Sequence, residues 1–127
     1  MARTIKQTVM FRASPHEIFE ALMDTKLHAK FTGAGASISR KVGGRFSAHD
    51  GYIEGTNVQL VKDNKIVQKW RGNDWPKGHY STATFTLEKT KDGTKLKFTQ
   101  TGVPDKFHTD ISHGWHEFYW QPMKKML

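Results

Sequence analysis

DISHGWHEFYWQPMKKML, residues 110–127, has the apolar spacing of a long amphipathic helix, and the rest of the chain must supply a surface that covers it. The apolar residues that recur on one helical face are Ile111, Trp115, Phe118, Tyr119, Pro122, Met123 and Met126. Pro122 removes the backbone hydrogen bond to the Phe118 carbonyl, so we expect a bend there. A bent helix fits the concave side of a curved sheet.

The residues before this helix read as short strands separated by turns. Gly43-Gly44, Asp50-Gly51, Asp63-Asn64 and Asp92-Gly93 are turn signals between runs rich in β-branched and aromatic residues. They predict an antiparallel meander with strands near residues 36–41, 45–49, 52–61, 65–71, 80–89 and 95–101. The alternation of apolar and polar residues over Thr4–Arg12 adds a first strand, which makes seven.

Two short helices are predicted between the first strand and the meander. Ser14-Pro15-His16-Glu17 is a capping box with proline at the first helical position, and Asp24 is expected to cap a second helix. The glycines of Thr32–Gly35 end that helix. The sequence therefore predicts one α+β domain over residues 1–127, with a curved seven-stranded antiparallel sheet, two short helices and one long C-terminal helix.

The composition indicates where the protein is located and which kind of partner it binds. The 127 residues contain no cysteine, and 20 Lys and Arg against 12 Asp and Glu give a net charge of +8. The absence of cysteine, of an apolar signal segment and of a membrane-length apolar run favours a soluble cytoplasmic protein that does not bind membranes. The charge favours acidic partners. The alternative is that the lysines only solvate the outer side of the sheet.

Basic residues are predicted to gather on the outer side of the sheet. We call Lys65, Lys69, Arg71, Lys95 and Lys97 the basic sheet face, because they share strand parities on neighbouring strands. Aromatic residues do not interleave with them, so we expect no nucleic-acid partner. As partner-binding residues we predict Lys69, Arg71, Lys95 and Lys97, with Trp75 in the adjoining loop; for Trp75, core packing is the alternative.

A ligand cavity is predicted between the sheet and the final helix. The wide apolar arc of that helix, with its adaptable methionines, favours space for an apolar small molecule. The residues predicted to line the cavity are Trp70, Trp115, Phe118, Tyr119 and Met123. The alternative is a filled core beneath a shallow cleft.

Catalytic and metal-binding patterns are weak in this sequence. His113 and His116, with His108 nearby, form the best histidine cluster, but a third rigid ligand and a second shell are not evident. No nucleophile elbow, phosphate-binding glycine loop or paired carboxylates occur. Glu54, on an apolar strand, is the one carboxylate that could act as a base, and an exposed or ion-paired role is the alternative. We therefore predict no catalytic residues, no metal and no cofactor.

The segment IVQKWRGNDWPKGHYSTATFTL, residues 66–87, resembles the signature of the activator-of-heat-shock-protein-90-ATPase family. The residues that carry the match are Trp70, Arg71, Trp75, Pro76, Gly78 and His79. Further support comes from Gly43-Gly44-Arg45-Phe46, Asp50-Gly51, Phe31-Thr32 and Gly114-Trp115, so the likeness is collinear over essentially the whole chain.

The resemblance implies a START-like helix-grip fold and a binding domain linked to heat-shock protein 90 (Hsp90) or the stress response. The eukaryotic activator has an additional N-terminal domain that docks on the chaperone, and this chain resembles the C-terminal domain alone. We therefore expect little stimulation of ATP hydrolysis. Stand-alone domains of this type include proteins that resemble carriers of apolar ligands, which is the alternative function.

Overall fold

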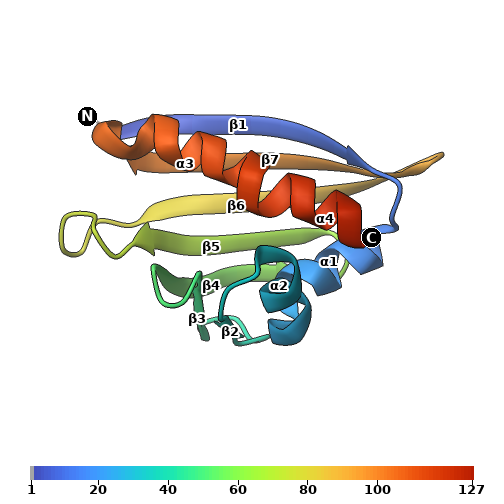
Figure 1. Ribbon diagram of the computed structural model, residues 1–127, viewed down its shortest axis with the longest axis horizontal. Coiled ribbons are helices and arrows are strands. Elements are labelled where there is room, and N and C mark those ends of the chain that lie inside the picture. Colours follow the sequence, from blue (N-terminus) through green and yellow to red (C-terminus); the bar gives the residue numbers. More distant parts are fainter. Residues whose placement is uncertain (1) are drawn as a thin grey trace.

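The computed structural model describes residues 2–127 and shows an antiparallel sheet curved around a C-terminal helical segment (Figure 1). Within these residues the sheet has seven strands in the spatial order β1-β7-β6-β5-β4-β3-β2. Their bounds are β1 (Ala2–Phe11), β2 (Ser37–Ile38), β3 (Arg45–Ala48), β4 (Ile53–Val61), β5 (Lys65–Gly72), β6 (Ser81–Thr90) and β7 (Gly93–Pro104). The predicted α+β class and strand count are confirmed.

The first predicted strand of the meander is much shorter than expected. Only Ser37 and Ile38 of residues 36–41 pair with β3. The residues that follow form a turn, because the buried Asn57 amide donates hydrogen bonds to the carbonyls of Ser39 and Lys41 at 2.7 and 3.0 Å. A side chain from β4 thus takes the place of a strand partner.

Helices α1 (Pro15–Met23) and α2 (Thr25–Thr32) begin at the predicted caps. The Ser14 hydroxyl accepts a hydrogen bond from the Glu17 amide at 3.2 Å, and the Ser14 amide donates to the Glu17 carboxylate at 3.1 Å. Asp24 accepts from the Leu27 amide at 2.9 Å. Gly33 ends α2 in the left-handed conformation, with φ of 73°. The local capping chemistry therefore fixes both helix starts.

The C-terminal segment is a composite of helical types. It runs through η1 (Asp105–Phe107), α3 (His108–Gly114), the π-helical η2 (Trp115–Trp120) and α4 (Gln121–Met126), and crosses the concave side of the sheet (Figure 1). The prediction of one long C-terminal helix is confirmed, and a π turn within it, over Trp115–Trp120, lies close to Pro122, where we expected a bend. The irregularity precedes Pro122, because the Gln121 amide donates to the His116 carbonyl five residues back. The wider turn ends where proline lacks a donor.

The π turn changes which side chains face the core. Trp120, absent from the predicted face, is 1% exposed, whereas Phe118, predicted to be on it, is 45% exposed. In a π turn, residues five apart share a face, and the rings of Trp115 and Trp120 stack at 5.5 Å. The predicted helical face is therefore wrong at these two positions.

Indole hydrogen bonds fix the helical segment on the sheet. Trp115 Nε1 donates to Gln100 of β7 at 2.8 Å, and Trp120 Nε1 donates to Gln7 of β1 at 2.7 Å. Gln7 in turn donates to the Ser112 carbonyl at 2.9 Å. Since Trp115, Trp120 and Gln100 are buried, these bonds satisfy polar groups that would otherwise be costly. They hold the segment in one register over the strands.

Candidate functional site

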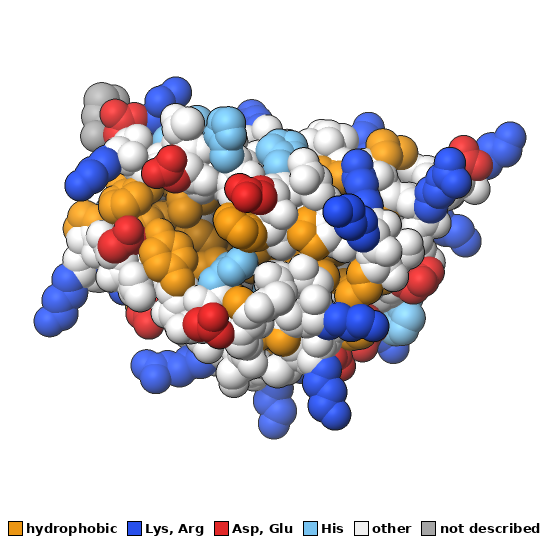
Figure 2. Space-filling model, viewed as in Figure 1, with side chains coloured by type: hydrophobic (Ala, Val, Ile, Leu, Met, Phe, Trp, Pro, Cys, Tyr) orange, Lys and Arg blue, Asp and Glu red, His pale blue; other side chains and the backbone are white. Residues whose placement is uncertain are grey.

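A pocket of about 280 Å³ opens between the helical segment and the strands β4 and β5. We call it the aromatic pocket; its lining residues are His49, Tyr52, Ile53, Trp70, Asp110, Ile111, Gly114, Trp115, Phe118 and Tyr119. Figure 2 shows the apolar hollow beneath α3, with acidic side chains and a histidine at its border. Four of the five residues predicted for a cavity line it. Met123 does not; it is fully buried in the core.

His49, Tyr52 and Asp110 line the aromatic pocket but were not predicted from the sequence. His49 lies in the turn before Gly51, with φ of 50°, and its ring lies 5.4 Å from that of Phe118 and 5.7 Å from that of Tyr119. The Asp50-Gly51 signal locates this turn in the sequence. It does not say that the turn carries an imidazole to the helical segment, since that contact depends on the sheet curvature.

The polar groups at the aromatic pocket have shifted acidities. The Tyr52 hydroxyl donates to Asp74 at 2.9 Å. Burial, that hydrogen bond and the charges of Asp74 and Asp110 raise the pKa of Tyr52 to about 12. Burial also lowers the pKa of His49 below its ordinary value of 6.5, which the charge of Asp50 only partly offsets. At neutral pH, Tyr52 is therefore protonated and His49 is mainly neutral.

A buried histidine lies behind the aromatic pocket. The His28 Nδ1–H donates to the Leu22 carbonyl at 3.1 Å, and its Nε2 accepts from the Tyr119 hydroxyl at 2.9 Å. Burial lowers the pKa of His28 to about 4 and raises that of Tyr119. Both groups are neutral at pH 7 and fix the Tyr119 ring at the pocket wall.

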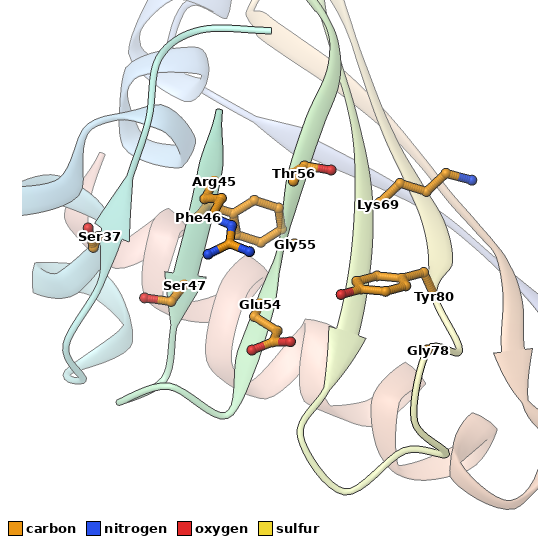
Figure 3. Close-up of a pocket in the computed structure, with 10 residues that line it drawn as sticks. All are labelled: Ser37, Arg45, Phe46, Ser47, Glu54, Gly55, Thr56, Lys69, Gly78 and Tyr80. Atoms are coloured by element: carbon orange, nitrogen blue, oxygen red, sulfur yellow. The ribbon is translucent and has the colours of Figure 1, made fainter. Parts of the chain in front are cut away.

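A second, shallow hollow of about 760 Å³ lies on the outer side of the sheet (Figure 3). Its lining residues are Ser37, Arg45, Phe46, Ser47, Glu54, Gly55, Thr56, Lys69, Gly78 and Tyr80. Lys69 is therefore at the surface where we predicted it, and its ammonium lies 3.4 Å from the Thr82 hydroxyl of β6. The side chains that line this hollow are mainly polar and basic.

Trp75 and Arg71 are not free surface groups. Trp75 is 4% exposed, and its ring packs against those of Trp70 and Phe107 at 5.4 and 6.1 Å. Arg71 donates to the Trp75 carbonyl at 2.8 Å and pairs with Glu54 at 3.4 Å. The expectation that Trp75 offers its ring to a partner needs correction, because the indole is part of the core and Arg71 holds its loop.

The rest of the basic sheet face is solvent-accessible. Strand register places Lys97 beside Thr86 and Thr86 beside Lys65, while Lys69 lies beside Thr82. Lys97 pairs with Glu88 at 3.1 Å, and both side chains are about half exposed. Lysines thus alternate with threonines across β5, β6 and β7.

The remaining candidates from the sequence are the histidine cluster and Glu54. In residues 2–127, no three His, Cys, Asp or Glu side chains lie together in a way that could hold a metal ion. Glu54 is half exposed and paired with Arg71. Over the same residues, no helix has both the length and the apolar character needed to cross a bilayer.

A curved antiparallel sheet that grips a C-terminal helix, with a pocket between them, defines the START-like helix-grip class. Residues 12–127 match the family model "Activator of Hsp90 ATPase homolog 1-like protein", and the chain belongs to this family.

Curated relatives share the sequence over nearly all of this chain. The human activator of 90 kDa heat shock protein ATPase homolog 1 is 33% identical over 122 residues, covering 96% of this chain and 36% of the relative. The Dictyostelium discoideum homologue is 32% identical over 114 residues, covering 89% of this chain and 30% of the relative. The chain thus spans about a third of these relatives.

Solved structures show the same fold. An HSP90 activator from Plasmodium falciparum superimposes with a TM-score of 0.87 at 29% identity, covering 99% of this chain and 95% of that one. The Aha1 dimer from Colwellia psychrerythraea gives a TM-score of 0.85 at 20% identity, covering 98% and 96%.

Proposed function

We propose that this chain is a non-catalytic binding domain that engages Hsp90 through its basic sheet face. The observation that supports the proposal most is the family match over residues 12–127, since the named relatives are activators of the Hsp90 ATPase. Relatives with that name act on an ATPase rather than carry the reaction themselves. A non-catalytic role of this kind agrees with the sequence, in which we found no strong catalytic motif.

The basic sheet face has the geometry of a docking surface. Lys69 and Lys97 are exposed on β5 and β7, and the intervening β6 presents Thr82, Thr84 and Thr86 between them. A regular sheet already orders the backbone that carries these groups, so binding requires no further backbone ordering there, and the main entropic cost is that of the lysine side chains. Short threonine side chains also leave the backbone sheet close to the partner surface.

Charge supplies the recognition in this proposal. A chain of net charge +8 gains in association rate when it meets an acidic surface. That gain falls as salt shortens the screening length from about 10 Å at 0.1 M to about 3 Å at 1 M. For residues 1–127 alone we expect little stimulation of ATP hydrolysis, since one contact region lacks the effective concentration that two tethered regions have.

Calorimetric titration of the chain against the Hsp90 of its own host tests the proposal. Lys69→Glu and Lys97→Glu should each weaken binding at low salt. Lys26→Glu, which makes the same charge change on an exposed position of α2, should weaken it much less. Undetectable binding at high micromolar concentration, or equal effects of the three substitutions, would rule out the partner or the surface.

The aromatic pocket favours a second candidate function, that of a carrier or sensor of a small ligand. Its volume of about 280 Å³ lies just below the range of roughly 300–1,000 Å³ that is usual for small-molecule sites. Its walls are mainly aromatic and apolar. Native mass spectrometry of protein purified from its host tests this function, together with titration of an environment-sensitive apolar dye. The absence of both an adduct and saturable binding would refute it.

A further inference from the structure

Asp110 is the only acidic residue among the lining residues of the aromatic pocket. The other ionisable residues that line it are His49, whose pKa burial lowers, and the tyrosines Tyr52 and Tyr119, whose pKa values are raised. No lysine or arginine is among the lining residues. The pocket is therefore negative, although the chain as a whole carries +8.

A second carboxylate, that of Asp74, lies close to Tyr52 of the aromatic pocket. Asp74 accepts the hydrogen bond of the Tyr52 hydroxyl at 2.9 Å. Asp110 lines the aromatic pocket together with Tyr52, and the charges of Asp74 and Asp110 both contribute to the raised pKa of the Tyr52 hydroxyl. Acidic side chains at the border of the apolar hollow are visible in Figure 2.

We propose that the aromatic pocket binds a small organic cation, with its apolar body against the pocket rings and its ammonium group beside Asp110. This inference rests on the second candidate function, the use of the pocket as a ligand site.

The pocket walls favour a cation over a neutral or anionic ligand of the same shape. The rings of Trp70, Trp115 and Phe118 line the pocket, and the electron-rich faces of aromatic rings attract ammonium groups. Asp110 makes no ion pair with another residue in the part of the chain that the structure describes, so its charge is available to a ligand.

The pocket size limits the ligand to a compact molecule. A volume of about 280 Å³ suits one aromatic ring or a short aliphatic body rather than a sterol or a diacyl lipid. Phe118, 45% exposed, lies at the open side of the pocket. The ammonium group can therefore reach Asp110 while the ring of the ligand lies deeper.

Three phenyl compounds that differ only near their terminal group test the proposal: 2-phenylethylamine, 2-phenylethanol and 3-phenylpropanoate. Each is titrated into the ¹⁵N-labelled chain at low salt, and amide shifts of the pocket residues report binding. We expect the amine to bind roughly two- to fivefold more tightly than the alcohol, as for an exposed charge interaction, and the carboxylate to bind most weakly.

Substitutions then separate the charge from the cavity. Asp110→Asn should remove the preference for the amine over the alcohol. Asp92→Asn makes the same change in the exposed turn before β7 and should retain the preference. Equal binding of amine and alcohol, or equal effects of the two substitutions, would overturn the cation inference while the ligand site stands. Saturable binding of none of the compounds would overturn both.

Discussion

The side chain of Arg71 binds the backbone of the loop that carries Trp75. The side chain of Arg71 is 12% exposed and its guanidinium donates to the carbonyl of Trp75, whereas the side chain of its ion-pair partner Glu54 is 50% exposed. A hydrogen bond from a charged, mostly buried donor stabilises far more than an exposed ion pair. At this site the backbone contact therefore matters more than the salt bridge.

Two substitutions distinguish these contributions. Arg71→Ala should lower the free energy of unfolding by about 1.5–3 kcal/mol, because the Trp75 carbonyl loses a charged donor. Glu54→Gln should change it by less than about 1 kcal/mol. Urea denaturation at neutral pH measures both values. Equal losses would show that the ion pair, and not the loop contact, is the stabilising interaction.

His28 makes stability depend on pH. The folded chain holds its pKa at about 4, below the ordinary value of 6.5, so the unfolded chain binds a proton first on acidification. The stability that His28 contributes is complete above pH 6.5 and is lost as the pH falls to about 4. The largest possible loss is about 3 kcal/mol.

The variant His28→Gln tests this pH dependence. It should flatten the decline of the unfolding free energy between pH 6.5 and 4.5, although His49, whose pKa is also lowered, leaves a smaller slope. Parallel pH profiles of wild type and His28→Gln would contradict the assignment.

At the scale of elements, two glycines have opposite roles. A Cβ at Gly55 of β4 would overlap the Lys69 carbonyl group of β5, so the two strands approach closely only with glycine there. A Cβ at Gly114, at the end of α3, would meet nothing closer than Phe118 Cδ2 at 3.8 Å. Glycine is required at the first position and only tolerated at the second.

This contrast predicts opposite changes in stability. Gly55→Ala should destabilise the fold by about 1–3 kcal/mol or more through overpacking against backbone. Gly114→Ala should stabilise it by about 0.5–1 kcal/mol, because alanine restricts the unfolded chain and favours helix. Thermal and chemical unfolding of the two variants provide the check. A stable Gly55→Ala protein would disprove the close approach of β4 and β5.

The sequence predicts elements well where local chemistry determines them. The capping residues Ser14 and Asp24 locate both short helices, and the turn glycines locate the meander. The π turn over Trp115–Trp120 could not be predicted, since regular helical spacing places Phe118 inside and Trp120 outside. The hydrogen bond from Trp120 to Gln7, 113 residues away, favours the other arrangement, and only the tertiary structure provides it.

The candidate site residues also fall into two groups, those whose position follows from local sequence pattern and those whose position depends on tertiary contacts. The parity of Lys69 and Lys97 follows from strand alternation alone. The burial of Trp75 depends on Phe107, which comes from beyond β7, and the position of Asp110 over Tyr52 depends on where α3 crosses the sheet. Contacts between distant segments, and not local pattern, therefore define the aromatic pocket.

At the scale of the whole molecule, the two sides of the sheet have different proposed roles. The concave side holds the helical segment and the aromatic pocket with its acidic mouth. The outer side presents lysines and threonines on β5, β6 and β7. A chaperone docked on the outer side would leave the pocket open, so the two proposed activities are compatible in one chain.

Lysine acylation rates, measured by mass spectrometry with and without the Hsp90 of the host, test the central claim most directly. The chain contains its own controls, because Lys69 and Lys97 are exposed on the sheet and Lys26 and Lys30 are exposed on α2. We predict that Hsp90 at low salt slows acylation of Lys69 and Lys97, leaves Lys26 and Lys30 unchanged, and loses this effect at 1 M salt, where the screening length is about 3 Å. Protection of the α2 lysines with unchanged rates at Lys69 and Lys97 would contradict the account.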